Sequence, residues 1–163
     1  LPGGLYTTVS FPDTVFKVLG THTTKCSVYV AGDQNALNDV VTGSFQVTAA
    51  SHNVLVQEIL APVGTVDSAS VVTPSAVVRN AGSETETFNA YMRIGSYVAA
   101  FVVSNLGAGA TRTISFSDWT ANAKDTVEAS CWTYLVGDEN PADDTMKQNF
   151  FVAVHDVGVA QVL

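Results

Sequence analysis

Two short acidic segments of the chain carry the residue types that bind hard cations. They are residues 32–39 (GDQNALND) and residues 137–144 (GDENPADD). Carboxylate and amide oxygens are the ligands that Ca²⁺ prefers, and the ion takes about six to eight of them. The sequence therefore predicts weak Ca²⁺ binding as one role for these segments. The candidate ligands are Asp33, Asn35, Asn38 and Asp39 in the first segment, and Asp138, Asn140, Asp143 and Asp144 in the second.

The same side chains also have a structural interpretation. Their spacing differs from that of the EF-hand loop, which needs a glycine at its sixth place and a glutamate at its twelfth. Asp and Asn side chains accept hydrogen bonds from nearby backbone N–H groups and so fix turns. Because a folding constraint acts on every copy of a repeated segment, the duplication favours turn fixation over cation binding.

The acidic segments belong to a longer internal repeat. When the chain is shifted by 105 residues, residues 1–48 and 106–153 are identical at 15 of 48 positions, among them Cys26 with Cys131. Such self-similarity at a fixed period indicates repeated structural units. After Val47 the register changes by two, so that HNVLVQEIL from residue 52 matches HDVGVAQVL from residue 155.

This register predicts three segments along the chain. Residues 1–50 are expected to be the C-terminal half of a repeat, and residues 51–154 a complete repeat. Residues 155–163 are expected to be the first strand of a following repeat. Because the chain begins and ends inside a repeat and begins with Leu rather than Met, we expect it to be a segment of a longer tandem array.

The residues that must position the acidic segments are rich in Val, Thr, Ala and Ser, with apolar residues at alternate places. This pattern is typical of β-strands. Seven short strands in about 100 residues predict an all-β fold, a tandem immunoglobulin-like seven-stranded β-sandwich with partial units at both ends. Pro74 lacks the N–H needed for a ladder bond, which places the second strand at a sheet edge or at a bulge. The expected strands cover residues 54–60, 70–80, 85–95, 96–106, 111–119, 126–137 and 146–154.

Composition limits the partners of the chain. The net charge is −8, with only 7 Lys and Arg residues, so we expect no nucleic-acid partner, which would need a basic face. No run approaches the ~18 apolar residues of a membrane span, so we expect no membrane insertion. Charged residues make up only 13% of the chain, which leaves a surface rich in Ser, Thr, Asn and Gly. That composition is commoner in secreted β-proteins.

Each repeat carries one cysteine at the same place. Residues at equivalent places in adjacent units lie far apart, whereas a disulfide needs Cα atoms within about 7 Å. We therefore expect Cys26 and Cys131 to be small buried thiols on strands, with an intermolecular bridge as the alternative.

No motif in the chain predicts catalysis. There is no zinc-ligand spacing, no Gly-x-Ser-x-Gly sequence and no phosphate-binding loop with its lysine. The sequence therefore predicts a protein that is not an enzyme and has no cofactor apart from weakly bound Ca²⁺. Four aromatic residues are candidates for a flat sugar-binding surface, although core packing is favoured for them: Tyr91, Tyr97, Trp119 and Trp132.

Three short phrases in the chain resemble the CARDB domain, a family named for cell adhesion that is found in bacterial and archaeal surface proteins. They are VRNAG at residues 78–82, the Leu-x-x-Gly bend at residues 106–109, and the acidic loop at residues 137–144. The resemblance covers residues 51–154 and, by repetition, the remainder. It implies a seven-stranded immunoglobulin-like fold, usually in tandem and usually extracellular, and it implies no catalytic residues.

These observations predict an extracellular or cell-surface structural protein, a segment or subunit of a filament, fibre or sheath. Its partners would be other copies of itself or adjoining repeats. We expect residues 155–163 to add as a strand to residues 1–50 of the next copy. The alternative is an accessory module of a secreted protein that binds polysaccharide or a cell surface. The predicted interface residues are Asp156, Val157, Val159, Val162 and Leu163.

Overall fold

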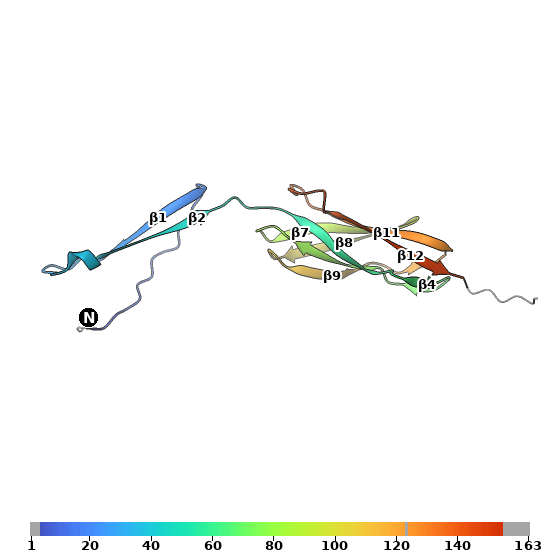
Figure 1. Ribbon diagram of the computed structural model, residues 1–163, viewed down its shortest axis with the longest axis horizontal. Helices are drawn as coiled ribbons and strands as arrows, with labels where there is room; N and C mark the ends of the chain where they lie inside the picture. Colours follow the sequence, from blue (N-terminus) through green and yellow to red (C-terminus); the bar gives the residue numbers. More distant parts are fainter. Residues whose placement is uncertain (1–3, 123, 155–163) are drawn as a thin grey trace, which may run out of the picture. The chain divides into compact units, whose positions relative to one another are not determined.

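The computed structural model describes residues 4–122 and 124–154, and its regular elements are β-strands apart from one short 3₁₀ turn (Figure 1). The chain divides into two compact units, the first ending at Ala49 and the second beginning at Ala50. The expected all-β fold class is confirmed. Within the described residues, no helix has the length and apolar character needed to cross a membrane.

The first unit consists of one hairpin and an irregular segment that precedes it. The strands β1 (Gly20–Ser27) and β2 (Val40–Val47) pair antiparallel along their whole length, and the 3₁₀ turn η1 (Ala36–Asn38) lies between them. The rings of Phe16, His22 and Phe45 form a small aromatic cluster on this hairpin, with centroids 4.7–5.5 Å apart.

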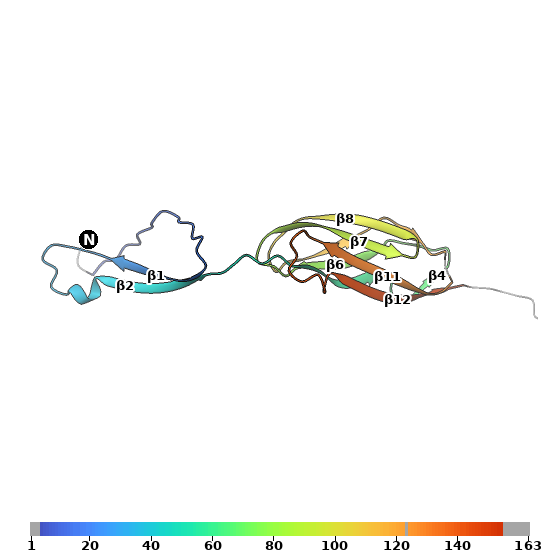
Figure 2. The same ribbon diagram turned by 90° about the horizontal axis from the view of Figure 1, so that it is seen from above.

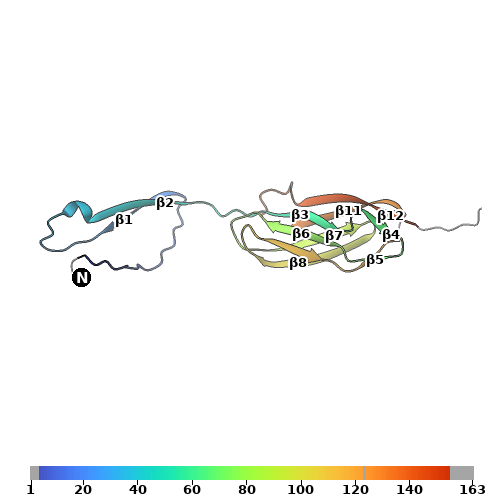
Figure 3. The same cartoon turned by 60° about the horizontal axis from the view of Figure 1, so that its bottom comes forward.

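The second unit is a sandwich of two main sheets. The larger sheet has the order β4-β12-β11-β7-β8, which Figure 2 shows across the unit, and the smaller has the order β3-β6-β9 (Figure 3). A third pair joins β10 to β5. The strands are β3 (Val54–Ala61), β4 (Thr65–Asp67), β5 (Val71–Val72), β6 (Ser75–Asn80), β7 (Glu86–Ile94), β8 (Tyr97–Leu106), β9 (Thr111–Ser115), β10 (Trp119–Thr120), β11 (Asp125–Tyr134) and β12 (Thr145–Ala153).

The core of the sandwich follows from alternation along the strands. In β7 every second residue is buried, and Met92, Ala90 and Phe88 are at most 3% exposed. Successive side chains of a strand point to opposite faces, so this pattern places one face of β7 in the core. The buried side chains of both sheets form a single cluster, which includes Ile59 of β3 and Ile114 of β9.

The observed strands differ from the expected ones in three details, one of which is the division of the predicted strand over residues 111–119 into β9 and β10. The predicted strand over residues 70–80 is divided at Pro74 into β5 and β6, because proline cannot donate to a ladder. Of the two places predicted for Pro74, a sheet edge or a bulge, the edge does not describe β6, which is the central strand of its sheet, whereas β5 belongs to a two-stranded pair with β10. The predicted loop after β3 contains β4, which pairs parallel with β12 in the opposite sheet.

The turn after β6 explains the VRNAG phrase. Asn80 is fully buried, and its side-chain nitrogen donates to the carbonyl oxygens of Glu84 (2.6 Å) and Leu106 (2.8 Å). Its side-chain oxygen accepts from the backbone nitrogen of Gly82 at 2.9 Å. A Cβ atom at Gly82 would clash with the carbonyl oxygen of Ser51, so only glycine fits there. The phrase therefore marks a structural constraint rather than a binding site.

Candidate functional site

The acidic loop between β11 and β12 lies beside the start of β3. The backbone nitrogen of Glu139 in this loop donates to the carbonyl oxygen of His52 at 2.9 Å. The loop is closed by its own backbone, because Asp138 N donates to the carbonyl oxygen of Leu135 (3.3 Å) and Asp143 N donates to that of Asn140 (3.2 Å). The loop thus joins the end of one sheet to the first strand of the other.

Asp138 fixes both the loop and the strand. Its Oδ1 accepts from the backbone nitrogen of Asn140 at 2.8 Å, which is the Asx-turn bond. Its Oδ2 accepts from the backbone nitrogen of Val54, also at 2.8 Å. Hydrogen bonds to an ionised carboxylate are roughly twice as strong as neutral ones. Asp138 therefore acts as a clamp on the first residue of β3.

Asp144 and Thr133 close the opposite side of the loop. The buried hydroxyl of Thr133 lies 2.9 Å from Asp144 Oδ1 and 3.2 Å from the carbonyl oxygen of Val54. Burial raises the pKa of the Asp144 carboxyl above its usual value, the Thr133 hydroxyl lowers it, and the charges of Asp138 and Asp143 raise it further. The loop therefore brings together three carboxylates, and the charges of Asp138 and Asp143 disfavour ionisation of Asp144.

Two oxygens in this cluster lack hydrogen-bond partners. Asp143 Oδ2 accepts from the side-chain nitrogens of Asn140 (2.8 Å) and Asn53 (3.3 Å). In contrast, Asp143 Oδ1 and Asn53 Oδ1 are buried and unpaired within the described residues. The carboxylates of Asp138, Asp143 and Asp144 come within 4.8 Å of one another. Since unpaired buried oxygens are costly, this set fits a hard cation.

The acidic loop of the first unit has the same backbone geometry. Asp33 Oδ1 accepts from the backbone nitrogen of Asn35 at 2.8 Å, as Asp138 does from Asn140. Asn38 N donates to the carbonyl oxygen of Asn35, and Val28 N donates to that of Asp39. Both loops therefore use their first Asp to fix the turn. Ca²⁺ binding by Asp33, Asn35, Asn38 and Asp39 stays a prediction.

The electrostatics of this first loop resemble those of the second. Desolvation raises the pKa of the Asp39 carboxyl, and the charge of Asp33 and a hydrogen bond from it raise it further. In the first unit Val28 stands where the second has Thr133, so Asp39 lacks the hydroxyl that Asp144 contacts.

An ion pair that the sequence analysis missed lies next to the loop. His52 Nδ1 is 2.6 Å from Oε1 of Glu86, a carboxylate that is only 8% exposed as a residue. The hydrogen bond to Glu86 raises the pKa of His52 above its usual value, and burial opposes the shift. The pair joins the residues before β3 to the start of β7.

The four aromatic candidates separate into core and surface. Trp119 packs edge-on against Phe150 in the core, and Tyr97 donates to the carbonyl oxygen of Ser117 at 2.5 Å. Tyr91 and Trp132 stack on the outer face of the larger sheet, with centroids 5.2 Å apart and planes 16° apart. Of the four candidates, this stacked pair is therefore the one that offers a flat aromatic surface to a ligand.

The two cysteines are both free but differ in exposure. Cys131 is fully buried, as expected, and burial raises the pKa of its thiol to about 12. Cys26 is exposed, so the prediction of a buried thiol is wrong for this residue. The difference arises because no described part of the first unit covers the face of β1 that carries it.

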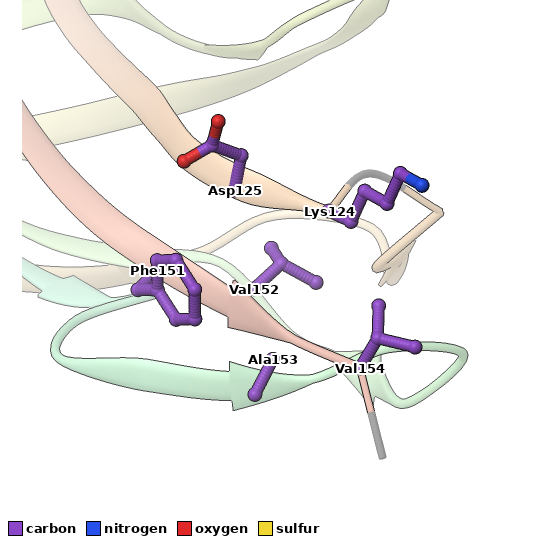
Figure 4. A pocket seen from close by; sticks show the side chains of 6 residues that line it. All are labelled: Lys124, Asp125, Phe151, Val152, Ala153 and Val154. Carbon is purple, nitrogen blue, oxygen red and sulfur yellow. The ribbon is translucent and has the colours of Figure 1, made fainter. Parts of the chain in front are cut away.

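A hollow of about 450 Å³ lies at the end of β12 (Figure 4). Phe151, Val152, Ala153 and Val154 line one side, and Lys124 and Asp125 line the other. Among the described residues, this lining offers one carboxylate and one ammonium group beside four apolar side chains.

The predicted interface residues cannot be placed by the structure. Asp156, Val157, Val159, Val162 and Leu163 lie outside the described residues. Their role stays a prediction, as does the division of the chain into one complete and two partial repeats.

Comparisons with known proteins identify the fold. No protein-family model and no curated protein matches the chain. Among solved structures, it resembles the CARDB domain of a Pyrococcus furiosus protein, crystallised in complex with di-metal ions, with 13% identity and a TM-score of 0.52. The match covers 66% of this chain and 96% of that one. A solution structure of the same Pyrococcus domain matches at 13% identity and a TM-score of 0.49, over 63% and 94% of the two chains. The expected resemblance to CARDB domains is thus confirmed at the level of the fold.

Proposed function

We propose that this chain is a non-catalytic structural segment of an extracellular adhesive or fibrous protein, built from tandem sandwich units. The observation that carries the proposal is the identity of two hairpins. The register of β1 with β2, from Gly20↔Val47 to Ser27↔Val40, is that of β11 with β12 shifted by 105 residues, from Asp125↔Val152 to Trp132↔Thr145. Repeated fold units in series form extended proteins, so a chain that repeats its hairpin without repeating a pocket is suited to a structural role.

The unequal burial of the two hairpins supports assembly. The first unit exposes large apolar side chains, among them Val9 (66%), Phe11 (73%) and Val28 (65%). Monomeric proteins rarely expose contiguous apolar surface, and such surface commonly marks an interface. Both the fold shared with an adhesion-related domain and the Thr- and Ser-rich surface are compatible with a position outside the cell.

Assembly of the full chain tests this proposal. Sedimentation velocity and negative-stain microscopy over a range of protein concentrations should show oligomers or fibres that grow with concentration. Surface labelling of intact cells that express the native protein should detect it from outside. A chain that stays monomeric at every concentration, or that labels only after the cells are opened, would contradict the proposal.

A cation at the acidic loop of the second unit is a further part of the proposed role. The unpaired oxygens of Asp143 and Asn53 beside three clustered carboxylates favour it. A hard cation there would neutralise the like charges and so strengthen the clamp on β3, because Asp138 and Asn53 hold that strand. The Pyrococcus domain with di-metal ions is consistent with this role.

The unfolding temperature measured with and without Ca²⁺ tests the cation. Binding to the folded state alone raises stability as the ligand exceeds its dissociation constant. Asp143→Asn should abolish the rise, whereas Asp118→Asn, which alters a carboxylate bonded to Thr73 away from the loop, should keep it. An equal response of both variants would rule out the loop as the binding site.

The stacked rings of Tyr91 and Trp132 favour a second candidate function, the binding of polysaccharide. A hollow of about 360 Å³ beside them is lined by Arg93, Lys147 and Trp132. Aromatic rings with nearby charged groups are a common surface for sugar rings. Retention of the chain on immobilised polysaccharides, and loss of retention in Trp132→Ala, would support this function. If Trp132→Ala were retained as well as the wild type, Tyr91 and Trp132 would be excluded as the polysaccharide-binding surface.

A further inference from the structure

We propose that the outer face of the larger sheet binds an acidic polysaccharide built from uronate units, which are sugars that carry a carboxylate. The carboxylate of one unit lies between Arg93 and Lys147, and the ring of the sugar packs on Trp132. This inference rests on the second candidate function above, the binding of polysaccharide, and names the chemical class of the polymer. Two cations, a buried hydroxyl and the uncovered face of one aromatic ring support it.

The two cations lie on either side of one residue of β11. Ser130 is directly opposite Arg93 of β7 and Lys147 of β12 in the register of the sheet. Neighbouring strands are about 4.8 Å apart, so the two cationic side chains start about 10 Å apart, a distance that they can close over a small anion. Arg93 is exposed and forms no ion pair among the described residues, so its guanidinium is available to a ligand.

Ser130 places a hydroxyl at the floor of the hollow between these cations. The residue is only 4% exposed, and it lines the hollow of about 360 Å³ together with Arg93, Lys147, Trp132 and Thr145. Its hydroxyl has no hydrogen-bond partner among the described residues. Most buried polar side chains have such a partner. A hydroxyl can donate to a carboxylate or accept from a sugar hydroxyl, so a uronate unit in the hollow would supply the missing bond.

The ring of Trp132 is covered on one face only. It stacks on Tyr91 with centroids 5.2 Å apart and planes 16° apart. This separation is close to the spacing of neighbouring strands, so the two rings stand side by side on β11 and β7. Trp132 and Thr145 line the hollow, whereas Tyr91 does not. The other face of the indole is therefore directed at the hollow, where the apolar C–H face of a sugar ring can pack on it.

One carboxylate of the outer face competes for the same cations. Glu128 Oε1 lies 3.1 Å from Lys147 Nζ, and the two side chains are 46% and 58% exposed. Ion pairs at such exposed places contribute little stability, so this one can give way to a ligand carboxylate that Arg93 binds at the same time. Arg93, Lys147 and Glu128 together carry one net positive charge, on a chain whose net charge is −8.

The acidic loop does not oppose an anion at this place. Asp138 accepts from the backbone nitrogen of Val54, and Asp143 accepts from the side chain of Asn53, at the start of β3 in the smaller sheet. Asp144 accepts from a buried hydroxyl of β11. These three carboxylates therefore face the core side of the larger sheet, and none of them lines the hollow.

The internal repeat indicates that the hollow is not a requirement of the fold. The counterparts of Trp132 and Lys147 in the first unit are Ser27 and Thr42. The hairpin β1–β2 nevertheless forms with the same register as β11–β12. A tryptophan and a lysine at these places are thus unnecessary for the hairpin, which leaves binding as the role that accounts for them.

The chemistry of the lining selects a uronate polymer among anions. A guanidinium binds a carboxylate through two parallel hydrogen bonds, and an ammonium group adds a second charge. A volume of about 360 Å³ is within the range of small-ligand sites, and the hollow is open, so a polymer can continue beyond the bound unit. An acidic peptide would match the cations but has no sugar ring to pack on Trp132.

Binding of the full chain to polygalacturonate and to its methyl ester, measured by calorimetry, tests the proposal. The two polymers differ only in the charge of the carboxyl group, and we expect the acid to bind at least about tenfold more tightly. Equal binding of both polymers, or binding of neutral polysaccharides alone, would overturn the selection of an acid but leave polysaccharide binding standing. A chain that binds no polysaccharide would overturn both. Poly-glutamate that binds as tightly as polygalacturonate would overturn the assignment to a sugar.

Paired variants then locate the site. Arg93→Gln should weaken binding of polygalacturonate about tenfold or more, whereas Arg79→Gln, an exposed arginine of β6 in the smaller sheet, should leave it unchanged. Glu128→Gln should tighten binding about twofold to fivefold, because it releases Lys147 from its ion pair. Glu58→Gln, an exposed glutamate of β3, is the matched control for that gain. Equal effects within either pair would show that net charge alone attracts the polymer and would overturn the site.

Discussion

The hairpins β1–β2 and β11–β12 share a register and an acidic loop, yet only one of them is part of a core. Cys131, Thr133 and Phe150 of the second hairpin are at most 3% exposed. At the equivalent places Cys26 and Val28 are exposed, and Phe45 is partly buried among the rings of Phe16 and His22. The backbone of a hairpin is thus specified locally, by the turn and the strand composition, whereas its burial depends on segments that come from elsewhere.

The largest expected effect comes from truncating one position in both units. Ile114→Ala should destabilise the second unit by about 2–5 kcal/mol, because it leaves a cavity in the core. Val9→Ala, at the equivalent place, should cost less than about 0.5 kcal/mol in dilute protein, because Val9 is exposed. Urea unfolding followed by tryptophan fluorescence measures the first change, since both tryptophans lie in the second unit. Equal losses would mean that Val9 is buried in solution.

Next in size is the difference in reactivity of the two thiols. Cys131 is buried and its pKa is raised to about 12, so it reacts only when the strand opens. Cys26 is exposed and should react with a maleimide at least about 100-fold faster in dilute protein. Mass spectrometry of labelled peptides at neutral pH gives both rates. Equal rates would contradict the structural contrast between the hairpins.

An exchange of the side chains at positions 28 and 133 should change the free energy of unfolding by an intermediate amount. Thr133→Val introduces the residue of the first unit and leaves the Asp144 carboxylate without its hydroxyl contact. We expect a loss of about 1–2 kcal/mol. Val28→Thr, the reciprocal change, should leave stability unchanged, because the position is exposed. Both values come from urea unfolding, and a neutral Thr133→Val would show that the hydroxyl is dispensable.

The smallest expected effect is a pH dependence confined to the second unit. The hydrogen bond to Glu86 raises the pKa of His52 in the folded state. The pair therefore contributes its full stabilisation of the folded state at pH values below 6.5, the ordinary pKa of histidine. Its contribution is lost as the pH rises through the raised value. His52→Gln should flatten the change in unfolding temperature over this range. His22→Gln, which alters a ring bonded to the Val18 carbonyl oxygen in the first unit, should keep it.

Local patterns in the sequence predicted much of this fold. The alternating apolar residues predicted the strand over residues 85–95, and the duplication favoured turn fixation in the two acidic loops, where Asp33 and Asp138 make the turn bonds. These features depend on neighbours close in the chain. The position of β6 at the centre of its sheet was not predictable. Pro74 lies between β5 and β6, so its missing N–H group interrupts the ladder there but does not determine which strands flank β6.

The candidate site was predicted only in part, because its geometry depends on distant residues. Asn53 contacts Asp143 across 90 positions, and Thr133 contacts Val54 across 79. Neither Asn53 nor Thr133 belongs to the acidic phrase, so spacing within the phrase could not identify them. The match of HNVLVQEIL with HDVGVAQVL was the one available signal, since it marked residues 52–60 as part of the repeated unit.

The parallel pairing of β4 with β12 has a consequence for a chain held under tension. Phe151 N donates to the carbonyl oxygen of Gly64, and Ser68 N donates to that of Ala153, so the first and last parts of the second unit are joined side by side. A force that pulls the two ends apart loads these bonds in shear. These bonds must then break together rather than one after another. We therefore expect the pairing of β4 with β12 to determine the force at which the second unit unfolds.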